Sequence, residues 1–229
     1  MHRPENPIDT GGLLVNVPLF NGLERREVAR IAAGTQPVAV ARGEVIYREG
    51  ETPTGLHLIV YGQVKLALHS SQGSEKVLEI LEAGETFGEA ELFLDDRYTL
   101  TAQALKESLL LHISRATLLD ELDRDPLLVR KMITGLCQRV HQVISDVEAC
   151  SLYSGCRRVV DYLLRSQPDG RQALTVTLPA TKYVIASRLS LTQETFSRIL
   201  NELSVRGLIA VEARQIHIPD VARLRAYAA

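Results

Sequence analysis

Three polar residues within the segment LTQETFSRIL, residues 191–200, have the types and spacing of a hydrogen-bonding surface. Glu194, Ser197 and Arg198 stand at i, i+3 and i+4, so a helix would present them on one face. A carboxylate can accept from a cytosine amino group, a guanidinium can donate twice to guanine, and a hydroxyl serves a base or a phosphate. Glu194 and Arg198 would also suit an ordinary surface ion pair, which contributes about 0.3 kcal/mol. The elements around them decide between these interpretations.

The segment lies within a predicted helix-turn-helix. Two helical patterns, residues 181–189 and 193–206, are separated by only three residues, and Thr192 is placed to cap the second helix. Two short β-type runs, residues 207–211 and 215–218, follow as a hairpin. Residues 153–229 therefore predict a winged helix-turn-helix, whose second helix reads the major groove of DNA. We expect the DNA contacts to come from Arg188, Ser190, Thr192, Gln193, Glu194, Ser197 and Arg198.

A long helix is predicted directly before this module, over residues 126–152. Its apolar residues recur at alternating steps of four and three, which is the heptad pattern of a coiled coil. Burial against the N-terminal part of the chain would also explain them. The strict 3.5-residue period over three heptads favours a two-helix seam and a homodimer with a two-fold axis. The expected seam residues are Val129, Ile133, Leu136, Val140, Val143, Val147 and Cys150.

Short alternating runs punctuated by glycines fill residues 38 to 113, as in 44–47, 57–61 and 64–68. This rhythm is typical of a small antiparallel roll or barrel. The predicted fold class is α+β, with a flexible N-terminus at 1–18, a β-roll effector-sensing domain at 19–125, the dimerisation helix and the winged module. Glu89 and Glu91 flank one alanine on a segment that we expect to be β-like, where they would share a side in a structural role.

Composition narrows the function classes. The net charge of −2 divides into +5 for residues 151–229 and −7 for the rest, which suggests a polyanion partner at one end. Cys137, Cys150 and Cys156 have no metal-binding spacing, and the absence of cysteine before Cys137 argues against an iron–sulfur cluster. No run approaches the roughly 18 apolar residues of a membrane span. We expect a cytoplasmic protein without membrane contact, and no catalytic motif indicates an enzyme.

The chain resembles the Crp/Fnr superfamily of bacterial transcription regulators. The resemblance rests on Glu-x-x-Ser-Arg at 194–198 and on GETFGEAELF at 84–93, and it extends from about Leu19 onward. The ETFSR form is most similar to the Dnr branch. That branch implies a haem-dependent nitric oxide sensor controlling nitrate respiration and denitrification, with RNA polymerase as a partner. The motif at 194–198 implies operators similar to TTGAT-N4-ATCAA.

The resemblance also implies where an effector would bind. Members that bind cyclic AMP use a carboxylate for the ribose, an Arg-Ser element for the phosphate, and polar residues of the central helix for adenine. Here Gly88-Glu89 supplies the first, Tyr98-Thr99 after Arg97 stands in register with the second, and Val143-Ile144 replaces the third. Cyclic AMP is therefore the less favoured effector, although it stays open. The expected pocket comprises Gly88, Glu89, Arg97, Tyr98, Thr99, Val140, Val143 and Ile144.

An apolar pocket would suit haem b, for which histidine is the usual ligand. His141 and His69 are the candidates, and neither is assigned as a ligand. The histidine pair associated with the Dnr N-terminus is replaced by Val17-Pro18 before Leu19-Phe20. A competing hypothesis makes the chain a cyclic-nucleotide regulatory subunit whose C-terminal module contacts a protein. Such a module would have no need of Arg198 beside Ser197.

Overall fold

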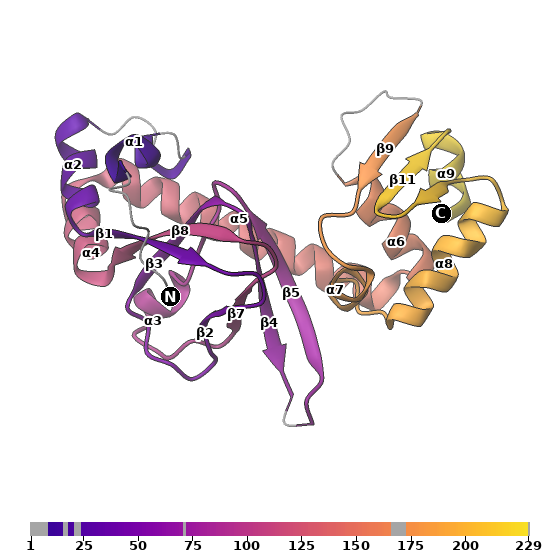
Figure 1. Ribbon diagram of the computed structural model, residues 1–229, viewed down its shortest axis with the longest axis horizontal. Helices are drawn as coiled ribbons and strands as arrows, with labels where there is room; N and C mark the ends of the chain where they lie inside the picture. Colours follow the sequence, from indigo (N-terminus) through magenta and orange to yellow (C-terminus); the bar gives the residue numbers. More distant parts are fainter. Residues whose placement is uncertain (1–8, 16–17, 21–23, 71, 166–172, 229) are drawn as a thin grey trace. The chain divides into compact units, whose positions relative to one another are not determined.

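The computed structural model describes residues 9–15, 18–20, 24–70, 72–165 and 173–228 (Figure 1). The chain divides into two compact units, residues 1–139 and 140–229. Among the described residues, no helix combines the length and the apolar character needed to cross a bilayer.

The first unit is a β-roll of two four-stranded antiparallel sheets. Its strands are β1 (Thr35–Val40), β2 (Val45–Tyr47), β3 (Gly55–Tyr61), β4 (Gln63–His69), β5 (Glu75–Glu82), β6 (Thr86–Phe87), β7 (Thr101–Ala104) and β8 (Ser108–Ser114). One sheet has the order β1-β8-β3-β6 and the other β2-β7-β4-β5. Every pairing is antiparallel, and β3 lies between β8 and β6 in its sheet. The predicted β-roll is thereby confirmed.

The central strands β3, β4 and β8 are buried on both faces, and their side chains belong to two apolar clusters in this unit. Ile59, Val64, Leu66, Phe87 and Tyr98 belong to the cluster inside the roll. A second cluster joins one face of the roll to the helices around it, and it includes the fully buried Leu14. Side chains of a strand point alternately to opposite faces, so a single strand such as β3 serves both clusters.

Four short helices accompany the roll, namely α1 (Thr10–Val15), α2 (Arg25–Ala33), α3 (Ala90–Leu94) and α4 (Arg115–Arg124). Residues 10–15, which we expected to be flexible, form a helix because Asp9 accepts from the Gly12 amide and Leu14 is buried. The rest of the expected N-terminal segment, apart from Asp9 and Pro18, lies outside the described residues. The segment of Glu89 and Glu91 is α3 with its N-cap, not a β-like stretch.

The helix predicted at 126–152 is α5 (Pro126–Leu152), which contributes to both units. Leu128 and Met132 are buried in the core of the first unit. The predicted seam lies on another face: Val129 and Leu136 are half-buried, and Ile133, Val140, Val143, Val147 and Cys150 are exposed. Burial in its own chain therefore does not account for most of the heptad pattern.

The second unit is a winged helix-turn-helix, as predicted. After α5 it contains α6 (Gly155–Leu164), β9 (Leu174–Thr177), α7 (Lys182–Arg188), α8 (Gln193–Val205), β10 (Ala210–Glu212), β11 (Gln215–Ile218) and α9 (Val221–Ala228). The sheet has the order β10-β11-β9. Ser154, Thr181 and Thr192 begin α6, α7 and α8, and the side chain of each accepts a backbone N–H of the first turn.

Candidate functional site

A side-chain cap and buried apolar residues fix the start of α8. Thr192 Oγ1 accepts from the Thr195 amide at 3.1 Å, which satisfies one of the free N–H groups of the first turn. Phe196, Ile199, Leu200 and Leu203 are buried and anchor the helix to its unit. The positive end of the helix dipole and the exposed Gln193 are left at the surface.

The polar trio occupies the outer face of α8. Glu194 and Arg198 are exposed and Ser197 is half-buried. Within the described part of the chain, no ion pair joins Glu194 to Arg198, whereas Arg206 and Glu202 further along do pair at 3.4 Å. The interpretation as a surface ion pair therefore finds no support in this structure, and both charged groups are available to a partner.

The turn between α7 and α8 is tight. Ser190 has a φ of 55°, in the left-handed region, and the Leu191 amide donates to the Ala186 carbonyl at 2.9 Å. Ser190 Oγ lies 3.1 Å from Cys150 Sγ near the end of α5. Ser190 is exposed and stands two residues before Thr192, the N-cap of α8.

Arg188 differs from the other expected DNA contacts. Its Nη2 donates to Asp146 Oδ2 at 2.5 Å, and only 13% of its side chain is exposed. Asp146 Oδ1 also accepts from Arg165 at 3.2 Å and from Gln142 at 2.9 Å. This set of contacts, which we call the Asp146 clasp, ties α5 to α6 and α7. A DNA contact from Arg188 would have to compete with it.

The expected effector residues Gly88 and Glu89 lie where β6 leads into α3. Gly88 has a φ of 85°, which favours glycine. Glu89 Oε1 accepts from Arg139 on α5, and the Arg139 guanidinium also donates to the Thr86 carbonyl. Glu89 Oε2 is buried without a hydrogen-bond partner among the described residues. Burial raises the pKa of Glu89, and nearby Arg139 opposes that rise. Sequence reasoning missed Arg139.

The three residues of the next expected element, Arg97-Tyr98-Thr99, make different contacts. Arg97 donates to the Gly50 carbonyl at 2.9 Å on the surface. Tyr98 is buried and stacks on Tyr47 with ring centroids 3.5 Å apart, and burial raises the pKa of Tyr98 to about 12. The Thr99 amide and Thr99 Oγ1 both donate to Glu91 Oε1, at 3.3 and 2.8 Å. Glu91 therefore contacts the expected effector site.

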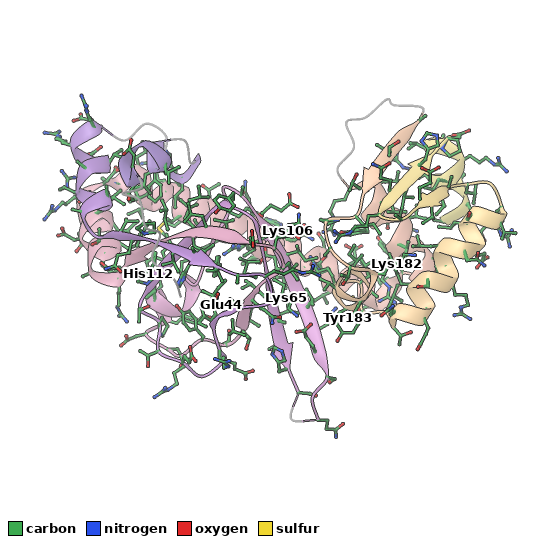
Figure 2. The ribbon with its side chains drawn as sticks, viewed as in Figure 1. Glu44, Lys65, Lys106, His112, Lys182 and Tyr183 are labelled. Carbon is green, nitrogen blue, oxygen red and sulfur yellow. The ribbon has the colours of Figure 1, made fainter. Side chains whose placement is uncertain are left out.

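A buried histidine lies beside this site. His57 on β3 stacks on Phe87 at 5.0 Å and lies 4.9 Å from the ring of His112, which Figure 2 labels. Burial lowers the pKa of His57 to about 3, so the ring is neutral. His57 Nδ1 has no partner in the described chain. A side chain added at Gly88 would place its Cβ 3.4 Å from both His57 Nδ1 and Tyr98 Oη.

The candidate haem ligands differ in their surroundings. His69 Nε2 lies 3.3 Å from Glu75 Oε2, and the same carboxylate pairs with Lys65 of β4 at 2.5 Å (Figure 2). His141 is exposed on α5 and shares a helix face with Ile144, three positions on. These surroundings distinguish the two candidates and assign neither as a haem ligand. Val140, Val143 and Ile144 belong to the second unit and are exposed.

Metal sites of other kinds find no support among the described residues, where no cluster of three or more His, Cys, Asp or Glu side chains is arranged to hold an ion. None of the three cysteines forms a disulfide. Cys150 and Cys137 are exposed and Cys156 is half-buried.

Comparison with known proteins assigns each unit a family. The family described as "Cyclic nucleotide-binding domain" matches residues 37–125, and "Crp-like helix-turn-helix domain" matches residues 157–227. The chain is 27% identical over 216 residues to a CRP-like cAMP-activated global transcriptional regulator of Mycobacterium tuberculosis, covering 93% of this chain and 96% of the relative.

Solved structures extend the comparison. The structure of DNR from Pseudomonas aeruginosa is 32% identical, with a TM-score of 0.51 over 98% of this chain and 100% of that one. FixK2 from Bradyrhizobium japonicum superposes with a TM-score of 0.74 over 85% of this chain and 98% of that one. At 24% sequence identity, this similarity to FixK2 shows a shared fold and nothing more.

Proposed function

Because the chain belongs to the Crp/Fnr family of transcription regulators, we propose that it reads palindromes similar to TTGAT-N4-ATCAA with Glu194, Ser197 and Arg198. The observation that carries the proposal is the pair of exposed, mutually unpaired charges at the capped start of α8. Arg198 suits a guanine edge, Glu194 a cytosine amino group, and Ser197 a base or a phosphate. Thr192, Gln193 and Ser190 are expected to contact the DNA beside them.

The exposed apolar face of α5 supports a homodimer. Ile133, Val140, Val143 and Val147 keep the heptad spacing and are each more than half exposed in the single chain. A parallel pair of such helices would bury them at a two-fold axis and present two copies of α8 to the two half-sites. We expect this dimer to act in the cytoplasm with RNA polymerase as its protein partner.

Fluorescence anisotropy with a labelled TTGAT-N4-ATCAA duplex tests the DNA proposal. Arg198→Ala is expected to weaken binding by about 1–3 kcal/mol, or roughly 5- to 150-fold, and to relax the preference for guanine. Arg206→Ala is the matched control, because it removes the same charge from the far end of α8, where Arg206 pairs with Glu202. Unchanged binding by Arg198→Ala would favour the hypothesis of a subunit that contacts a protein.

For the effector we propose nitric oxide acting through haem, with control of nitrogen-oxide respiration as the role. Support comes from the 32% identity to DNR over its full length and from the Glu-x-x-Ser-Arg segment. His141 and His69 are the candidates to hold the iron, and His141 has the apolar side chain of Ile144 beside it. A bound haem iron supplies a site for nitric oxide that side chains alone lack.

An absorbance spectrum of protein loaded with haem under reducing, anaerobic conditions tests this effector. We expect a Soret band that shifts when nitric oxide is added and that is lost in whichever of His141→Ala and His69→Ala removes the axial ligand. A spectrum without such a band, or a band indifferent to nitric oxide, contradicts the proposal.

Cyclic AMP is the second candidate effector. Two relatives favour it, since the Mycobacterium tuberculosis regulator is cAMP-activated and a Thermus thermophilus relative is a cyclic AMP receptor protein. If DNA binding rises on addition of cyclic AMP and is indifferent to haem, this candidate replaces the first.

A further inference from the structure

The donors of the α3–β7 segment are already occupied by a carboxylate from the same chain. A phosphate group needs N–H or O–H donors and gains most from a nearby cation. The Thr99 amide and Thr99 Oγ1 are two adjacent donors of this kind, and both donate to Glu91 Oε1. Glu91 is only 8% exposed, so its carboxylate is held among protein groups rather than free in water.

The cations near these donors are committed elsewhere. Arg97 donates to the Gly50 carbonyl at the surface. Arg139 pairs with Glu89 and lies 3.7 Å from Glu79. Tyr98, between Arg97 and Thr99, carries a neutral hydroxyl. The guanidinium of Arg139 is thus already paired with two carboxylates, those of Glu79 and Glu89.

We propose that Glu91 is a specificity-determining residue that makes this site refuse phosphate anions, because its carboxylate occupies the Thr99 donors that a cyclic nucleotide would need. The inference rests on the proposed role of the first unit as an effector-sensing domain, and it narrows the ligand of that unit to a molecule that brings no anion to Thr99. An incoming phosphate would have to displace the buried Glu91 carboxylate from Thr99, while Arg139 is already paired with Glu89 and Arg97 donates to the Gly50 carbonyl.

Titration calorimetry with cyclic AMP and with adenosine, its counterpart without the phosphate, tests the role of Glu91 in the full-length protein. The wild type is expected to show no preference for cyclic AMP over adenosine. Glu91→Ala is expected to bind cyclic AMP about tenfold or more tightly than the wild type does, with no comparable gain for adenosine. Glu107→Ala, an exposed glutamate of the β7–β8 turn, is the matched control and should behave as the wild type.

Glu91→Gln keeps the shape and one acceptor while removing the charge, so it should gain a smaller part of the same affinity. If circular dichroism shows that Glu91→Ala unfolds at a lower temperature than the wild type, Glu91→Gln replaces it as the test variant. Tight binding of cyclic AMP by the wild type overturns the proposal, as does the absence of any gain in a folded variant. An equal gain for adenosine overturns it too, because the substitution would then merely open space.

Binding of the wild type to the TTGAT-N4-ATCAA duplex without any nucleotide is measured in parallel. A failure there bears on the proposed DNA-binding function and leaves the calorimetric result about Glu91 standing.

Discussion

At the scale of single residues, the neutral histidine inside the roll has a measurable thermodynamic consequence. His57 is 3% exposed, its Nδ1 has no partner in the described chain, and its pKa lies near 3 instead of 6.5. In the unfolded chain the same imidazole takes up a proton below about pH 6.5. The unfolded state therefore binds more protons than the folded state as the pH falls, and the free energy of unfolding must fall with it.

We predict that His57 makes the wild type lose about 1.4 kcal/mol of stability between about pH 7.5 and 5.5, a loss that His57→Phe removes. Urea unfolding followed by circular dichroism at the two pH values measures it. The raised pKa values of Glu85 and Glu89 act in the opposite direction, so the difference between wild type and variant is the quantity to compare. His141→Gln, at an exposed position, is the control. A variant with the same pH slope as the wild type would contradict the prediction.

Sequence patterns predicted some of the residues described above and missed others. Thr192 and the trio on α8 were predictable, because caps and helical faces depend on neighbours a few positions apart. Arg139 and Glu89 are 50 positions apart and Arg188 and Asp146 are 42 apart, and no local pattern joins them. His57 stood on a predicted strand, yet its burial between Phe87 and His112 depends on pairing across the sheet.

At the scale of elements, sequence reasoning predicted the segments that have a clear period of apolar residues or a helix N-cap residue. The long helix, α7, α8 and several strands of the roll follow this rule. α1 and α3 do not: the first carries two glycines, and the second is only five residues long. Tertiary contacts stabilise both, through buried Leu14 in α1 and through Glu91 and Leu92 in α3. Propensity is overridden by such burial.

The Asp146 clasp gives the prediction at this scale. Asp146→Ala leaves Arg188, which is nearly buried, without its carboxylate, so we expect a loss of about 2 kcal/mol in the stability of the second unit. Asp161→Ala is the control, because its pair with Arg157 is long and exposed and should contribute less than about 1 kcal/mol. Chemical denaturation compares the two, and equal losses would mean that the clasp contributes no more than a surface pair.

At the scale of the whole molecule, dimerisation decides whether two recognition helices can act together. Five of the seven seam residues on α5 are exposed in the single chain, and the apolar side chains have the spacing of a coiled coil. Each subunit would meet one half-site, so affinity for a palindrome depends on the association of two copies.

We predict that Val143→Asp weakens dimerisation by about 100-fold or more, because two carboxylates would be buried at the two-fold axis without partners. Sedimentation equilibrium measures the association, and affinity for the palindrome should fall with it. Ser145→Asp introduces the same charge on the same helix, at an exposed position away from the seam. An unaltered dimer in Val143→Asp would place the interface on another face.

The continuity of α5 has a consequence for folding cooperativity. Its 27 residues rise about 40 Å, and they supply Leu128 and Met132 to the core of one unit and Asp146 to the clasp of the other. If either unit unfolds its part of this helix, the helix that the other unit packs against is shortened. We therefore expect heat to unfold the two units in one transition instead of two. A fragment that ends or begins at residue 139 contains only part of the helix. We expect each fragment to be more stable when it contains all of residues 126–152.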